Sequence, residues 1–177
     1  PFYEWHVARN IKELLNTLNI YFCKKKNSVI KPALSRGSRG VFILFNNNKK
    51  KMKPYKSSRE LHMGYKYFFK NFKNLKLNFP ILISDFMKTP IYDVDTVSYK
   101  GISKKIIIRK RKIPYDGNLG HTVINNKKIL NYSKLIIKKM NLSYLLDFDI
   151  MLDEKKKPKL IEINPRMSGS IGESYKN

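Results

Sequence analysis

Apolar residues recur along the chain at two different spacings, which distinguish expected helices from expected strands. Spacings of three and four residues predict a helix at the N-terminus, with one apolar stripe formed by Val7, Ile11, Leu14, Leu15 and Leu18. The serine-to-glutamate spacing from Ser57 to Glu60 is typical of a capping box, and it predicts a second helix with the stripe Leu61, Tyr65, Phe68, Phe69 and Phe72. A third helix is expected over residues 127–140, with Ile129, Ile136, Ile137 and Met140 facing inward.

Short β-branched runs and alternating runs predict strands around these helices. They cover residues 28–32, 41–45, 81–86, 91–97, 104–111, 146–152 and 160–166. Residues 114–121 are irregular and contain glycine, and we expect a surface loop there that includes the lone His121. The mixture of helices and strands predicts an α+β fold.

The last expected strand has one polar face. Successive side chains of an extended backbone point to opposite faces, so Glu162, Asn164 and Arg166 share one side, and Ile161 and Ile163 the other. A solvated strand at a sheet edge would explain this pattern equally well. The strand before it in the chain is what distinguishes a site from a solvated edge.

These last two strands should pair as an antiparallel hairpin. If the turn centres between residues 155 and 156, Asp149 lies opposite Glu162 and Asp147 opposite Asn164, all on one face. Like charges directly opposite one another destabilise a sheet, and a divalent cation between them would reverse that effect. Carboxylate and carboxamide oxygens are hard ligands of the Mg²⁺ type, so the hairpin predicts a magnesium site.

A second candidate site lies in the hairpin loop between strands 28–32 and 41–45. The loop is longer than a chain reversal requires, and its glycines, serines and arginines suit a phosphate cradle: Ser35, Arg36, Gly37, Ser38, Arg39 and Gly40. Lys31 adds a positive charge at the base of the loop. A mobile basic hairpin tip is the alternative interpretation. Neither a P-loop motif nor a Rossmann glycine motif is present in the sequence.

The formal net charge of +24 over 177 residues invites a nucleic-acid interpretation. Only seven of the 37 basic residues are arginines, however, and phosphate-reading proteins usually rely more on arginine. Lysine enriched together with asparagine and isoleucine indicates the base composition of an AT-rich genome, so nucleic acid is an unlikely partner. A single cysteine excludes an internal disulfide, and together with the lack of a secretory signal or a long apolar segment it predicts a cytoplasmic protein and no membrane partner.

The chain resembles the ATP-grasp enzymes, especially their carbamoyl-phosphate synthase-like branch. Four segments carry the resemblance in the family's order: Val29–Pro32 with Ser35–Val41, Ile81–Phe86, Tyr92–Asp95, and Asp149 with Glu162–Arg166. The sequence departs from the family's pattern at Ile91, where an acidic residue is usual, and at Ser84, which replaces one acid of a pair. The start at Pro1 suggests a piece of a longer chain that lacks the family's preceding domain.

The resemblance implies an ATP-grasp fold in which two α+β lobes with antiparallel sheets clasp ATP between them. Residues 1–90 would form the lobe with the glycine-rich phosphate loop, and residues 91–177 the lobe with the magnesium site. Lys31 and the loop residues Ser35, Arg36, Gly37, Ser38 and Gly40 would contact phosphate, and the backbone of Ser84, Asp85 and Phe86 would meet adenine. Asp149, Glu162 and Asn164 would hold Mg²⁺, with Mn²⁺ as the alternative metal, and Arg166 would be catalytic.

The implied reaction joins a carboxylate to an amine or another nucleophile through an acyl phosphate, with consumption of ATP. The enzyme could be a homo-oligomer. Two alternatives remain open at this point: a basic nucleic-acid-binding module, favoured by the charge, and a degenerate, non-catalytic ATP-grasp scaffold, favoured by Ile91.

Overall fold

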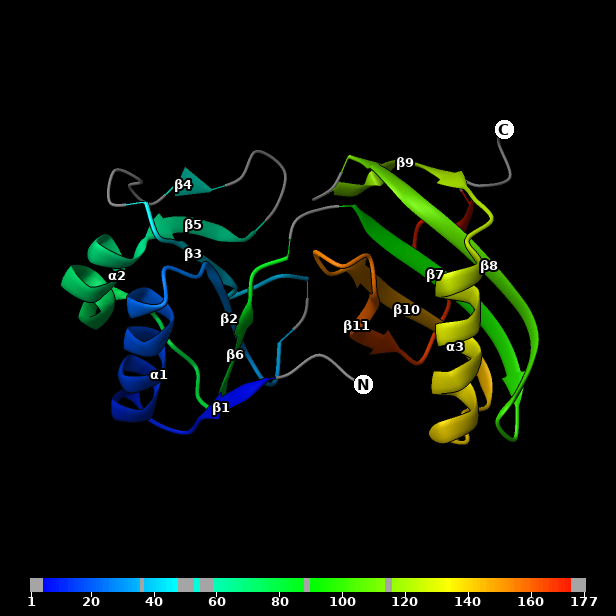
Figure 1. The fold of residues 1–177 in the computed structure, drawn as a ribbon, viewed down its shortest axis with the longest axis horizontal. Helices are drawn as coiled ribbons and strands as arrows, with labels where there is room; N and C mark the ends of the chain where they lie inside the picture. The colour runs from blue at the N-terminus through cyan, green and yellow to red at the C-terminus, as the bar shows by residue number, and fades with distance from the viewer. Residues whose placement is uncertain are drawn as a thin grey trace. The chain divides into compact units, whose positions relative to one another are not determined.

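The protein folds into two compact α+β units (Figure 1), which are described separately. The first unit is Glu4–Phe86, and the second contains Met87–Asn177. The computed structural model describes residues 5–35, 37–47, 53–54, 59–87, 90–113 and 116–172. Within this part of the chain, no helix combines the length and apolarity needed to cross a membrane.

The first unit is built on one mixed sheet. Its strands lie in the order β1-β6-β2-β3-β5-β4, and their bounds are β1 His6–Ala8, β2 Ser28–Pro32, β3 Phe42–Phe45, β4 Lys53–Pro54, β5 Leu61–Gly64 and β6 Ile81–Asp85. The neighbours pair antiparallel except β3 and β5, which are parallel. The helical segments are α1 Ile11–Cys23, α2 Tyr65–Asn71 and a 3₁₀ turn at Phe72–Asn74.

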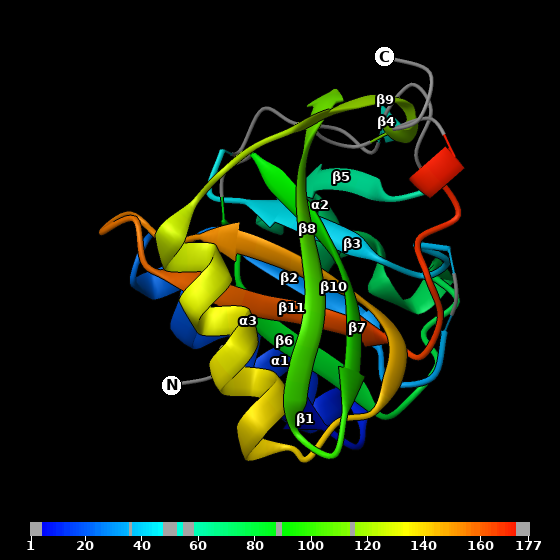
Figure 2. The same cartoon turned by 90° about the vertical axis from the view of Figure 1, so that its right-hand side faces the viewer.

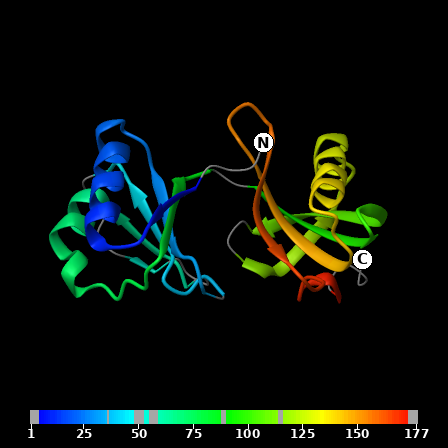
Figure 3. The same cartoon turned by 90° about the horizontal axis from the view of Figure 1, so that it is seen from below.

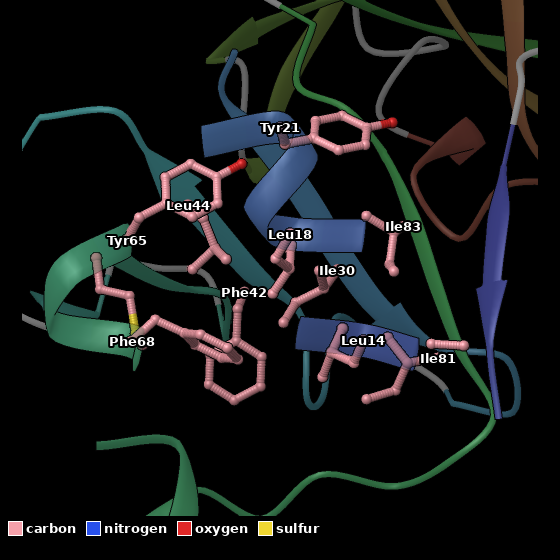
Figure 4. Packing of buried hydrophobic residues seen from close by; sticks show 12 residues of the cluster. Leu14, Leu18, Tyr21, Ile30, Phe42, Leu44, Tyr65, Phe68, Ile81 and Ile83 are labelled. Carbon is pink, nitrogen blue, oxygen red and sulfur yellow. The ribbon is translucent and has the colours of Figure 1, made fainter. Parts of the chain in front are cut away.

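Two helices cover one face of this sheet and bury its core (Figure 4). Leu14 and Leu18 of α1 pack beside Phe68 of α2, and all three side chains are fully buried. Ile30 on β2 and Ile83 on β6 meet them from the sheet. Each fully buried aliphatic or aromatic side chain contributes about 1.5–3 kcal/mol relative to an exposed one. Leu14, Leu15 and Leu18 of the predicted stripe thus face the core, whereas Ile11 at the start of α1 is 37% exposed.

The start of α1 was predicted too early. Val7 belongs to strand β1, where it is paired with Leu82, and it is 47% exposed. Helix α1 begins after Asn10, whose side-chain oxygen accepts a hydrogen bond from the Glu13 backbone at 3.0 Å. This cap satisfies a backbone donor that the first helical turn leaves without a partner, which leaves residues 6–8 to pair with β6.

The capping box predicted at residues 57–60 does not start a helix. Residues 55–58 lie outside the described residues, Leu61 belongs to strand β5, and α2 begins after Gly64, which makes no side-chain cap. Pairing of β5 with β3 outweighs the helical spacing at Leu61. The apolar stripe continues as predicted from Tyr65. The helix is therefore shorter than the predicted one, which began at Leu61.

The second unit is a five-stranded antiparallel sheet with one long helix. The strands lie in the order β11-β10-β7-β8-β9, and their bounds are β7 Ile91–Tyr99, β8 Ile102–Ile113, β9 Asp116–Val123, β10 Tyr144–Leu152 and β11 Pro158–Asn164. Helix α3, Lys127–Lys139, runs beside these strands (Figures 2 and 3). The segment expected to be an irregular loop is thus largely strand β9.

One face of this sheet is apolar and packs against α3. Phe148 and Ile150 on the central strand β10 are fully buried, and Ile129 and Ile136 of α3 lie in the same cluster. Met140, which the spacing placed inward, is 47% exposed because α3 ends there and Met140 is its C-cap. Side chains alternate between the two faces along β10. Asp147 and Asp149, which flank Phe148 in the sequence, therefore point to the opposite face, where the polar site lies.

Candidate functional site

The β10–β11 hairpin has the register that the sequence predicted. Asp149 is paired with Glu162, and Asp147 with Asn164. The Asn164 side-chain amide donates a long hydrogen bond of 3.5 Å to an Asp147 carboxylate oxygen. Three carboxylates and one carboxamide are therefore adjacent at the edge of the second sheet.

A β-bulge in β11 separates these pairs from the turn. Ile150 lies opposite Leu160, so the ladder nearer the turn is shifted by one residue relative to the ladder at the acids. The turn consequently centres on Lys155, and the assumption of a centre between residues 155 and 156 was wrong, although the bulge restores the predicted pairs. Leu160 and Ile163 both pack against the core, and Ile161 is the residue left unpaired at the bulge.

Strand β7 brings two further carboxylates to the same face. Asp93 lies opposite Asp149, and Asp95 lies opposite Asp147 on the other side of β10. Asp93, Asp95 and Asp147 are buried, and the Asp149 side chain is 22% exposed. Four aspartates on two adjacent central strands require compensation, because buried charges are tolerated only when they are paired or bind a metal.

Arg109 on β8 compensates Asp95. Its side chain is fully buried and contacts an Asp95 oxygen through Nε at 2.9 Å and Nη2 at 2.6 Å. The other Asp95 oxygen accepts a hydrogen bond from the Ser168 backbone at 2.8 Å, and Arg109 Nη1 donates to the Ser170 carbonyl at 3.2 Å. This ion pair therefore holds the segment that follows β11 against the sheet.

Arg111 and His121 compensate Asp93. Arg111 donates to both Asp93 oxygens, at 2.8 and 2.6 Å, and His121 Nε2 lies 2.7 Å from one of them. Burial alone would raise the pKa of Asp93, but these hydrogen bonds and the Arg111 charge outweigh it and hold that pKa below its ordinary value. Arg111 also donates to Asp149 at 3.1 Å. The expectation that His121 lies in a surface loop was wrong, because β9 carries it into this network with a fully buried side chain.

Asp147 and Asp149 keep an excess of negative charge. Burial raises the pKa of Asp147 to about 7, with Asp149 and Asp95 adding to the shift. Burial also raises the pKa of Asp149 to about 6, since Asp93 and Glu162 oppose the effect of Arg111. One oxygen each of Asp93, Asp147 and Asp149 lies within 4.8 Å of the others. Hard oxygen donors gathered in this way fit a divalent cation such as Mg²⁺.

These shifts predict a pH-dependent effect of replacing Asp147 with asparagine. A carboxyl whose folded-state pKa is raised above its unfolded value favours the folded state fully only at low pH, and that contribution disappears as the pH rises towards 7. In a chelator and without nucleotide, the variant should therefore match the unaltered protein near pH 4 and exceed its free energy of unfolding by on the order of 2 kcal/mol near pH 8. Urea unfolding at both pH values measures this difference. An equal difference at both would show that ionisation of Asp147 is not its cause.

The predicted catalytic residue lies just beyond the hairpin. Arg166 is exposed, follows the end of β11 at Asn164, and donates to the Met167 carbonyl at 2.9 Å. The strand on which it was expected to continue the polar face therefore ends two residues earlier.

In the first unit, the glycine-rich loop connects β2 and β3 as an antiparallel hairpin. Gly37, Ser38 and Gly40 have positive φ angles of 59°, 58° and 72°. A Cβ at Gly40 would lie 3.0 Å from Pro32 Cγ, so glycine is required there both by conformation and by space. Ser35 donates to the Arg39 carbonyl across the loop.

The remaining predicted ATP contacts also belong to this first unit. Lys31 lies on β2 with its ammonium group 4.5 Å from the centre of the Trp5 ring, and Arg36 lies outside the described residues. On β6, Ser84 is buried and Asp85 pairs with Lys26 at 3.0 Å. The Phe86 backbone donates to the Asn27 carbonyl, and the Phe86 ring contacts Phe45.

The polar side chains on this face form one polar network. Four of its members were discussed from the sequence, namely Asp147, Asp149, Glu162 and Asn164, and five were not predicted as site residues: Asp93, Asp95, Arg109, Arg111 and His121. Two signals were available, namely aspartates at alternate positions of one strand and arginines at alternate positions of the next. Both patterns put like charges on one face, which is costly unless a strand of opposite charge lies beside it. The position of His121 has no comparable signal in its glycine-containing segment.

Comparison with known proteins gives a family match. A family model described as "ATP-grasp in the biosynthetic pathway with Ter operon" matches residues 78–176, which is more than half of the chain. The match includes all of β7 to β11 and therefore the complete polar network. No curated protein sequence matches the chain.

Solved structures agree on the fold over nearly the whole chain. An L-amino acid ligase from Bacillus licheniformis is 14% identical with a TM-score of 0.59, and the match covers 99% of this chain and 39% of that one. The biotin carboxylase domain of 2-oxoglutarate carboxylase from Hydrogenobacter thermophilus, solved with MgADP, is 13% identical with a TM-score of 0.60, covering 96% and 37%. N5-carboxyaminoimidazole ribonucleotide synthetase from Thermotoga maritima is 13% identical with a TM-score of 0.56, covering 96% and 38%. The chain thus spans under two fifths of the length of these structures.

Proposed function

Since the chain belongs to this ATP-grasp family, we propose that it is the Mg-ATP-binding part of a ligase that activates a carboxylate as an acyl phosphate. The observation that carries the proposal is the pairing of Asp149 with Glu162, two carboxylates directly opposite each other, with Asn164 one pair further along. Such an arrangement destabilises a sheet unless a cation lies between the groups. A structural neighbour of the same fold was solved with MgADP.

Three residues would hold the metal in this proposal: Asp149, Glu162 and Asn164. Mg²⁺ bound there would neutralise phosphate charge and polarise the phosphoryl group for transfer. Arg111, which already contacts Asp149 at 3.1 Å, fixes the orientation of that carboxylate. Arg166 is the exposed cation beyond β11 and would stabilise the transferring phosphoryl group.

The first unit would bind the rest of the nucleotide. Lys31 would contact phosphate as a positive charge, and the backbone N–H groups of the loop 35–40 would cover the phosphates. The loop's left-handed residues and the crowding at Gly40 favour a preformed loop over a random hairpin tip. The backbone of residues 84–86 would meet adenine.

The proposed reaction has two steps. A carboxylate oxygen of the substrate attacks the γ-phosphorus of ATP, the bond to the bridging oxygen breaks, and ADP leaves with an acyl phosphate formed. An amine or another nucleophile then attacks the acyl carbon, and inorganic phosphate leaves with the bonding electrons. The amine loses one proton, and the products are ADP, phosphate and an amide.

Hydroxylamine tests this function without knowledge of the natural nucleophile, because it attacks acyl phosphates and yields hydroxamates. The chain is incubated with Mg-ATP, hydroxylamine and single carboxylic acids from a panel of amino acids, hydroxy acids and short peptides. We expect ADP release that depends on one class of acid, with an equal amount of its hydroxamate. ADP release without any hydroxamate would contradict the acyl-phosphate step, and ATP binding without ADP release would favour a non-catalytic scaffold.

A further inference from the structure

Asp147 is the aspartate of the polar network that the two arginines leave uncompensated. It is 4% exposed, and its Oδ1 has no hydrogen-bond partner among the described residues. In the part of the chain that the structure describes, its Oδ2 is reached only by the Asn164 amide, at the long distance of 3.5 Å. The role proposed above for the metal does not use this residue.

Each of the other three aspartates on this face has an arginine partner. Arg111 and His121 contact both oxygens of Asp93, and Arg111 also contacts Asp149. Both oxygens of Asp95 are bonded, one to Arg109 and the other to the Ser168 backbone. Two guanidinium groups thus face four aspartates, and Glu162 adds a fifth carboxylate at the edge. A buried carboxylate without a partner is costly when it is ionised, and a bound cation would offset that cost.

The position of Asp147 suits coordination of such a cation. One of its oxygens lies within 4.8 Å of an oxygen of Asp93 and of Asp149. Two ligands on opposite sides of one ion are about 4–5 Å apart, given metal–oxygen distances of roughly 2.0–2.6 Å. The β10–β11 register adds Glu162 beside Asp149 and Asn164 beside Asp147. Asp147 is therefore paired with one predicted ligand, Asn164, and close enough to a second, Asp149, to bind the same ion.

We propose that Asp147 is an additional metal ligand, and that with it the second unit binds a divalent cation before any nucleotide is present. This proposal rests on the proposed function, because both use Asp149, Glu162 and Asn164 as metal ligands. Two carboxylates and an amide leave much of the coordination of Mg²⁺ to ATP phosphates and water. A third carboxylate raises the charge of the protein ligand set, which is how oxygen sites gain affinity for divalent cations. The cation would then be in place to receive the phosphates of ATP.

Mn²⁺ is a suitable probe, since carboxylate sites accept it and its free form is measured directly by electron paramagnetic resonance. The full chain is titrated with Mn²⁺ near pH 8, first without nucleotide and then with ATP. The variants are Asp147→Asn, Glu162→Gln and, as a matched control in the turn of the same hairpin, Glu154→Gln. Glu162 is exposed, so its replacement keeps the fold even if that of Asp147 does not.

We expect one Mn²⁺ per chain without nucleotide, at least tenfold weaker binding in D147N and in E162Q, and unaltered binding in E154Q. Absence of nucleotide-free Mn²⁺ binding in the unaltered chain, or equal affinity in D147N, would overturn the inference. The titration with ATP separates failure of this inference from failure of the proposed function. If the unaltered chain binds Mn·ATP but not Mn²⁺ alone, only the inference fails. If it binds neither, both fail.

Discussion

Replacing Arg109 with methionine should lower the free energy of unfolding of the second unit by about 3–5 kcal/mol, the cost of leaving a buried charge without its partner. Asp95 is 3% exposed and, among the residues that the structure describes, would keep only the Ser168 backbone as a donor. Loss of Arg109 would also release Ser170, whose carbonyl accepts from Nη1. Urea unfolding followed by circular dichroism measures the loss.

The neighbouring residue provides the control. Lys110 on the same strand is exposed, so its replacement by methionine should change the free energy of unfolding by no more than about 0.5 kcal/mol. A double variant with Asp95→Leu and Arg109→Met should recover part of the loss, because replacing both members of a buried pair leaves no isolated charge. If R109M unfolds at the same urea concentration as K110M, the ion pair does not stabilise the unit.

Replacing Glu162 with glutamine should weaken ATP binding in magnesium at least tenfold. Glutamine keeps the size of the side chain but removes one of the charges opposite Asp149, and Mg²⁺ binds carboxylates in preference to amides. A tenfold loss corresponds to about 1.4 kcal/mol of binding free energy. Isothermal calorimetry with ATP in excess Mg²⁺ measures it.

Glu154→Gln is the matched control for this variant, because it removes the same charge from the exposed turn of the same hairpin. Its ATP affinity should equal that of the unaltered chain. If both glutamine variants weaken binding equally, the loss is not specific to Glu162 and does not identify it as a metal ligand. If neither does, Glu162 does not contribute to nucleotide binding.

The parts of this molecule that the sequence predicted are those set by local spacing. The hairpin of β10 and β11 is closed by a short turn, so counting residues from that turn located Asp149 opposite Glu162. Even there the count succeeded because the bulge in β11 offset the misplaced turn centre. Helix α3 was found by its stripe, and it ends where Met140 becomes exposed.

The parts that escaped prediction depend on pairing between distant segments. Strand β10 pairs with β7, about fifty residues earlier in the chain, and this pairing alone brings Asp93 and Asp95 to the acidic face. His121 reaches Asp93 because β9 pairs with β8. At the N-terminus, Val7 follows the helical spacing, but residues 6–8 gain ladder hydrogen bonds to β6. Long-range pairing of this kind overrides local propensity and cannot be read from spacing.

The most direct test of the account is the affinity of the unaltered chain for ATP in magnesium and in a chelator. If Asp149, Glu162 and Asn164 hold the metal that meets the phosphates, ATP should bind at least tenfold more tightly in magnesium. Without a cation, three phosphates would face an already acidic sheet. Equal affinity under the two conditions would contradict the metal–phosphate site.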